Sequence, residues 1–120
     1  MVNNQTLLEM PPMELLEYMQ AHYMLDLPAQ MDDIDTMNHV SELLSVTTSN
    51  YAFLTNLTML AKLKKREAKR EKKSKEECED ALSREEIISK FADISKAYYN
   101  ALSRMLTVKQ QINQEMKMGM

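Results

Sequence analysis

The chain has almost no residues that end a helix, and this restricts its fold more than any other feature. Only one Gly and three Pro occur among 120 residues. Gly and Pro are the strongest breakers of regular structure, so a chain with so few of them is expected to form a small number of long elements. Hydrophobic residues make up 44% and charged residues 28%, a balance that excludes a disordered chain and a membrane protein. The sequence therefore predicts an all-α fold in a single domain, residues 1–120.

Charge is distributed unevenly along the chain. Residues 1–61 contain eight acids and no Lys or Arg, whereas residues 62–75 contain nine basic side chains and two acids. The stretch Leu43–Ala61 has no charged residue, but its many Ser, Thr and Asn make it too polar to cross a membrane. No signal-like segment opens the chain, and the lone Cys78 has no internal disulfide partner. We therefore expect a cytoplasmic protein without a membrane segment.

Periodicity and helix-start signals predict three helices. Pro11 and Pro12 precede a helix over 12–23, whereas residues 1–10 lack periodicity and are expected to be a mobile tail. Ser83 and Glu86 form a capping-box pattern, which predicts that the last helix begins there and ends near Lys117. Between these two helices, apolar or small residues follow a regular 3,4 spacing, which is the pattern of one helical seam and predicts a third helix. This seam comprises Met37, Val40, Leu44, Thr47, Tyr51, Leu54, Thr58 and Ala61.

The two longer helices are expected to form an antiparallel αα-hairpin. Their seams match if the chain folds back about Cys78, which places Lys65 opposite Phe91 and makes residues 62–80 a projecting, solvated tip. A second seam along residues 43–60 widens the apolar face to roughly 160°. The remaining face is small and polar, which allows close helix approach, so we expect protein to cover residues 43–61 on most sides.

One thin hairpin cannot bury such wide apolar faces, so the sequence predicts an oligomeric helical bundle. In this interpretation the short N-terminal helix and the hairpin of several copies assemble as a homo-oligomer. The residues expected to mediate self-association are Tyr51, Phe53, Leu54, Leu57, Tyr98 and Met105.

The basic segment KLKKREAKREKKSK, residues 62–75, has two interpretations. It could be a solvated helix, because Glu71 lies four residues before Lys75 and so can compensate part of its charge. It could instead bind the phosphates of a nucleic acid, although no aromatic residue between positions 54 and 90 is available to stack on bases. The residues that would contact nucleic acid are Lys62, Lys65, Arg66, Lys69, Arg70 and Lys73.

Four acids raise a second alternative. The pairs Glu14/Glu17 and Asp32/Asp35 have i,i+3 spacing, which places two carboxylates on one helix face. This pattern resembles the paired carboxylates with which all-helical nucleotide pyrophosphatases hold Mg²⁺, and the resemblance implies a Mg²⁺-dependent nucleotide hydrolase. Helix capping explains the same acids without a metal.

The C-terminal segment AYYNALSRMLTVKQQINQEMKM, Ala97–Met118, is similar to the tails of small helical proteins encoded by bacteriophages and prophages of Gram-positive bacteria. This resemblance implies a cytoplasmic accessory role in phage replication, recombination or counter-defence, and it transfers no catalytic residue. The leading hypothesis from the sequence is a non-enzymatic, homo-oligomeric helical bundle that binds another protein and needs no cofactor or metal. Nucleic acid is the alternative partner.

Overall fold

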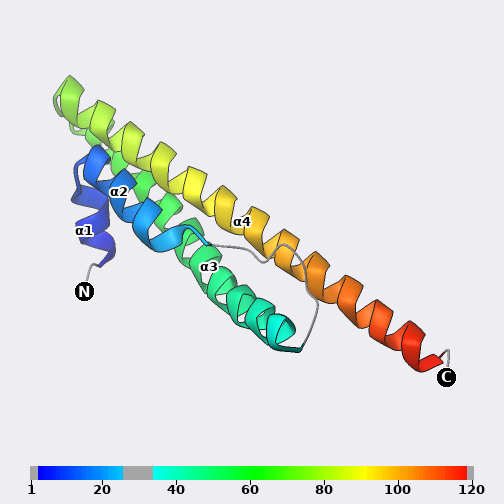
Figure 1. The fold of residues 1–120 in the computed structure, drawn as a ribbon. Helices are drawn as coiled ribbons and strands as arrows, with labels where there is room; N and C mark the ends of the chain where they lie inside the picture. Colours follow the sequence, from blue (N-terminus) through cyan, green and yellow to red (C-terminus); the bar gives the residue numbers. More distant parts are fainter. Residues whose placement is uncertain (1–2, 26–33, 119–120) are drawn as a thin grey trace.

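The computed structural model describes residues 3–25 and 34–118, which form four helices and no strand. The two long helices lie antiparallel as a hairpin, and the two short ones lie beside the half of the hairpin that contains its turn (Figure 1). The molecule is elongated, with dimensions of 71 × 22 × 21 Å. The all-α fold and the αα-hairpin are therefore confirmed. The helices are α1 (Asn4–Glu9), α2 (Pro12–Tyr23), α3 (Ile34–Arg70) and α4 (Lys75–Met118).

Helix α1 occupies a segment that the sequence predicted to be a mobile tail, and that prediction is wrong for residues 3–10. The Asn3 side chain caps α1 by accepting a hydrogen bond of 2.9 Å from the Thr6 amide. Leu7 and Leu8 are buried in the core, and the Arg84 Nε donates a 2.7 Å hydrogen bond to the Met10 carbonyl. Six residues are too few to show helical periodicity, so tertiary contacts fix a helix that the sequence pattern does not reveal.

The core lies where α1 and α2 meet the hairpin. Helix α2 has the predicted bounds and packs on α4, whereas α1 packs on α3. Leu15 and Met19 of α2 are fully buried, as are Leu54, Leu57 and Ile88 of the hairpin. Burying one such side chain contributes about 1.5–3 kcal/mol. The complete buried cluster is Leu7, Leu8, Leu15, Met19, Leu54, Leu57, Ala61, Ile88, Phe91 and Ala92.

The hairpin turn comprises residues 71–74, so the predicted reversal about Cys78 is wrong. Helix α3 ends in a Schellman motif, in which the amides of Lys72 and Lys73 bond to the carbonyls of Lys69 and Ala68. Lys72 has a φ of 53°, in the left-handed region where Gly is usual. Because this turn contains no Gly, the end of α3 lacks the usual sequence signal of a Schellman motif.

Helix α4 begins earlier than predicted, at Lys75. Ser74 caps it by accepting a 3.2 Å hydrogen bond from the Glu77 amide, and the Ser74–Glu77 spacing fits a capping box. The pattern at Ser83 and Glu86 therefore lies inside the helix and does not start it. A capping box and an ordinary surface pair look alike in sequence, because only the preceding backbone conformation distinguishes them.

The earlier turn also changes which residues of the two arms face each other. The Lys65 ammonium contacts the Glu85 carboxylate at 2.6 Å, whereas the sequence placed Lys65 opposite Phe91. The most buried column of α4 is Ala81, Ile88, Ser95 and Leu102. The predicted α3 seam is correct at Val40, Thr47, Leu54 and Ala61, all of which are buried.

The projecting part of the hairpin is the end away from the turn. The sequence predicted that residues 62–80 would form a projecting, solvated tip. Most of these residues are exposed, but α1 lies beside part of the segment, where Ala68 is buried. The N-terminal half of α3 and the C-terminal half of α4 extend beyond the short helices instead (Figure 1). Among the described residues, no helix is long and apolar enough to cross a membrane.

Candidate functional site

The residues predicted to mediate self-association are used mainly by the chain's own core. Leu54 and Leu57 are fully buried, and Phe53 packs half-buried against the same cluster. The Phe53 ring stacks on the Tyr23 ring with centroids 6.2 Å apart. The two short helices thus supply the cover that the sequence analysis assigned to other copies. The helix over 12–23 was predicted from the sequence, but neither it nor residues 3–10 was placed against this face of the hairpin.

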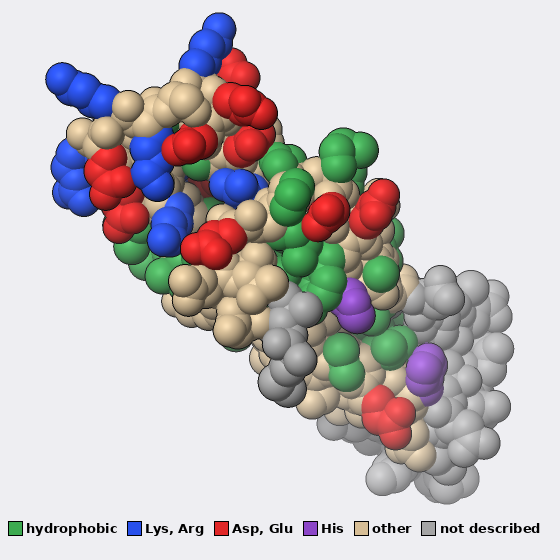
Figure 2. Space-filling view, turned by 90° about the vertical axis from the view of Figure 1, so that its left-hand side faces the viewer, with side chains coloured by type: hydrophobic (Ala, Val, Ile, Leu, Met, Phe, Trp, Pro, Cys, Tyr) green, Lys and Arg blue, Asp and Glu red, His purple; other side chains and the backbone are tan. Residues whose placement is uncertain are grey.

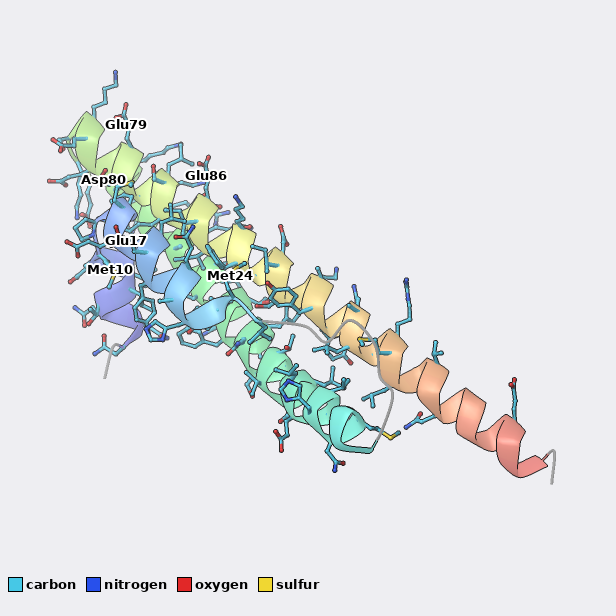
Figure 3. The ribbon with its side chains drawn as sticks, in the orientation of Figure 1. Met10, Glu17, Met24, Glu79, Asp80 and Glu86 are labelled. Carbon is cyan, nitrogen blue, oxygen red and sulfur yellow. The ribbon has the colours of Figure 1, made fainter. Side chains whose placement is uncertain are left out.

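The C-terminal end of α2 contacts both arms of the hairpin. The Tyr98 hydroxyl lies 3.8 Å from the Met24 sulfur, and Figure 3 shows Met24 where α2 ends beside α4. Burial raises the pKa of the Tyr23 phenol above its ordinary value of 10.0, and the neighbouring Tyr18 raises it further. Tyr51 and Met105, the other two predicted contact residues, are half-buried.

The back of α3 presents a second, fully exposed row of residues at heptad spacing. Ser45 and Leu54, and likewise Ala52 and Ala61, are nine residues apart, which corresponds to about 180° around a helix. The row therefore faces away from the core. We call it the exposed α3 seam, and all eight of its members are exposed: Glu42, Ser45, Ser49, Ala52, Asn56, Met59, Leu63 and Arg66.

Two features make this seam unlike an ordinary solvent-facing surface. Its central six residues carry no charge, and they include two large exposed hydrophobic side chains, Met59 and Leu63. Solvent-facing helix surfaces usually carry Lys and Glu. The outer face of α4 fits that description, because Glu86, Lys90, Asp93, Lys96 and Arg104 are exposed there.

Part of this face was expected from the sequence to lie in a different environment. Ser41, Ser45, Thr48, Ser49, Thr55 and Asn56 were expected to be covered by protein, and all six are exposed within one chain. The signal that could have identified the seam is the continuation of the same 3,4 spacing through Ala52, Met59 and Leu63. Cover by another molecule stays a prediction.

The basic segment lies at the turn end of the hairpin. Basic and acidic side chains are interspersed there on the face shown in Figure 2. Five of the six residues predicted to contact nucleic acid are exposed, namely Lys62, Arg66, Lys69, Arg70 and Lys73. Lys65 is held in its ion pair with Glu85. Two looser pairs, Lys73–Glu71 at 3.8 Å and Lys75–Glu79 at 3.9 Å, compensate part of the remaining charge.

A surface cavity of about 340 Å³ lies between α1 and the turn end of the hairpin. Its charged lining consists of three basic and three acidic side chains, so it has no net charge to attract a phosphate or a metal ion. Figure 3 shows Glu79 and Asp80 at this end of α4, and Asp80 belongs to the lining. The complete lining is Leu8, Glu9, Lys64, Ala68, Lys73, Glu77, Asp80, Ala81 and Arg84.

The four acids of the predicted Mg²⁺ site are only partly described by the structure. Glu14 and Glu17 are exposed on α2, and Figure 3 shows Glu17 on that helix. Asp32 lies outside the described residues, as does the side chain of Asp35. Among the side chains that the structure does describe, no group of three or more His, Cys, Asp or Glu is placed to hold a metal ion.

Comparisons with known proteins give no match: no protein-family model fits the chain, and neither curated proteins nor solved structures resemble it significantly.

Proposed function

We propose that this chain is a non-enzymatic protein-interaction module that binds its partner through the exposed α3 seam. The observation that supports this proposal is the seam itself, in which eight positions at heptad spacing are all exposed and the central six are uncharged. Small residues at such spacing allow a second helix to approach to about 8–10 Å, and large apolar residues supply the area that such a contact buries. The resemblance of Ala97–Met118 to phage-encoded helical proteins supports an accessory or counter-defence role for this module.

Two further observations favour a binding module over an enzyme. The one described group with a raised pKa, Tyr23, is part of the packing between α2 and α3, whereas catalytic groups with shifted pKa values usually line a cleft. The charged cavity beside α1 offers no convergent charge. The seam, in contrast, is a long helix surface whose central six residues are uncharged.

A photo-crosslinking experiment tests the proposal. A photoreactive amino acid replaces Ala52, in the middle of the seam, and a matched variant carries it at Glu86, an exposed position on the outer face of α4. After irradiation in cells, we expect a protein adduct from position 52 and little or none from position 86. Equal adducts from the two positions, or none from position 52, would contradict the proposal.

A second candidate function is nucleic-acid binding by the basic segment. The observation that favours it is the exposure of Lys62, Arg66, Lys69, Arg70 and Lys73 at one end of the molecule. The ion pairs at Lys65, Lys73 and Lys75 reduce the charge available for phosphates. We therefore rank this function below protein binding.

The salt dependence of DNA binding separates the two functions. A phosphate-binding segment gives a slope of about 0.7–0.9 in log K per neutralised phosphate against log salt. Changing Lys69, Arg70 and Lys73 to Gln would flatten that slope by about two to three units. The matched control changes Lys90, Lys96 and Arg104 of α4 to Gln, which removes the same charge from another part of the surface. We expect no micromolar DNA binding at physiological salt and no loss of partner binding in either variant. Binding that disappears only in the first variant would establish the second function.

A further inference from the structure

We propose that the partner of the exposed α3 seam is the same seam of a second copy of this chain, running antiparallel to it. This inference rests on the proposed function and names the partner of that site. It differs from the assembly predicted from the sequence, because the residues involved lie on the opposite face of α3 from Leu54 and Leu57.

The two ends of the seam have opposite charge. Glu42 lies at its N-terminal end and Arg66 at its C-terminal end, both exposed, and neither forms an ion pair among the described residues. The same polarity extends over the whole helix, because residues 1–61 contain no Lys or Arg and residues 62–75 are strongly basic. Opposite charges attract and like charges across an interface reduce affinity. The charge pattern therefore complements itself only in the antiparallel orientation.

A parallel pair would make each of these contacts unfavourable. In a parallel dimer every seam residue meets its own copy, so Glu42 would face Glu42 and Arg66 would face Arg66. The serines would also face one another, leaving Met59 and Leu63 to pack only at one end. An antiparallel pair instead brings each acidic end onto a basic end.

Side-chain size specifies the position at which the two helices cross. The 3,4 spacing divides the seam into two columns of residues seven apart. In an antiparallel coiled coil, a residue of one column faces a residue of the other column on the second helix. If the crossing is centred on residue 54, Leu63 faces Ser45 of the second copy and Met59 faces Ser49 of the second copy. Each large side chain, exposed by 51% and 62% respectively, then meets a small one, as close packing requires.

The same register also places the remaining members of the seam. Asn56 faces Ala52 of the second copy on either side of the two-fold axis, and Arg66 faces Glu42 of the second copy at both ends. The eight positions span about 36 Å of helix at 1.5 Å per residue. Because the surface is self-complementary under a two-fold rotation, the assembly closes as a dimer.

Charge exchange at Glu42 and Arg66 tests this dimer. The molecular mass of full-length wild type, Glu42→Lys, Arg66→Glu and the double variant is measured by sedimentation equilibrium over a range of micromolar concentrations. We expect a wild-type dimer, at least about a tenfold increase in Kd for each single variant because the contact occurs twice per dimer, and recovery to within about threefold in the double variant. Both side chains are exposed, so circular dichroism should show unchanged folding. Glu86→Lys on α4 is the matched control and should leave the Kd unchanged.

The possible failures differ from those of the proposed function. A wild-type monomer, a double variant that stays as weak as the single ones, or single variants that dimerise as well as wild type would each overturn the antiparallel dimer. If the wild type is a monomer and position 52 still crosslinks to another protein, the proposed function stands and only the identity of the partner is wrong. If the wild type is a monomer and position 52 gives no protein adduct, the antiparallel dimer and the proposed function are both wrong.

Discussion

Truncation of Leu57 to Ala should destabilise the protein more than truncation to Ala on the exposed face of the same helix. Leu57 is fully buried in the cluster to which all four helices contribute. Leu→Ala changes at such sites cost about 2–5 kcal/mol, and the cost is higher where the surroundings cannot collapse into the cavity. Packing from four helices restricts such collapse, so we expect about 3–5 kcal/mol, a large part of the 5–15 kcal/mol typical of a domain. At roughly 4 °C per kcal/mol, Tm should fall by about 12–20 °C.

The assay is thermal and urea unfolding followed by circular dichroism at a concentration low enough to keep the chain monomeric. Met59→Ala is the matched control, because Met59 lies two residues away on the exposed face. It should change the free energy of unfolding by no more than about 0.5 kcal/mol. A Leu57→Ala loss below about 1 kcal/mol, or equal losses in the two variants, would refute the assignment of Leu57 to an intrachain core.

Further predictions concern the turn, a buried hydroxyl, alkaline pH and Mg²⁺. Lys72→Gly should raise the free energy of unfolding by about 0.5–1 kcal/mol in urea titrations, since Gly relieves the left-handed backbone of the Schellman motif at φ 53°; a loss of stability would contradict the turn. Thr47→Val should raise it by about 1–3 kcal/mol, because the fully buried Thr47 hydroxyl has no hydrogen-bond partner among the described residues; destabilisation would show that the hydroxyl is satisfied. Because burial raises the pKa of Tyr23 in the folded chain, the unfolded chain ionises first, so stability should fall as pH rises above about 10 and fall less steeply in Tyr23→Phe; identical pH profiles would argue against the shift. Millimolar Mg²⁺ should change Tm by less than about 1 °C in both wild type and Glu17→Gln, and a rise of several degrees seen only in wild type would support the metal site.

The sequence predicts the long elements well because their signals are repeated along many turns. The bounds of α2, the hairpin and the buried face of α3 follow from Pro12 and from a 3,4 spacing sustained through Ala61. Features that depend on a few residues were missed. Helix α1 is too short to show a period, and the turn at Lys72 uses a non-Gly residue in a left-handed conformation, which no sequence pattern marks.

The function-related surface could be predicted only in part, for a related reason. An uncharged helix face has the same sequence pattern whether another helix of the same chain or another molecule covers it. The sequence showed that residues 43–61 lack charge, but only the positions of α1 and α2 decide which side of α3 is left open. Leu54 and Leu57 were therefore assigned to an interface, and the row through Ala52 and Met59 was not recognised as one.

Distances between spin labels test whether two α3 seams meet antiparallel. In a Cys78→Ser background, a label is placed at Thr55 in one variant and at Lys69 in another, both exposed beside the seam. With the crossing centred on residue 54 and a rise of 1.5 Å per residue, the two Thr55 labels should lie close together and the two Lys69 labels about 45 Å apart along the helix axis. Short distances at both positions would indicate a parallel pair, and the absence of dipolar coupling at Thr55 would show that the seams do not meet.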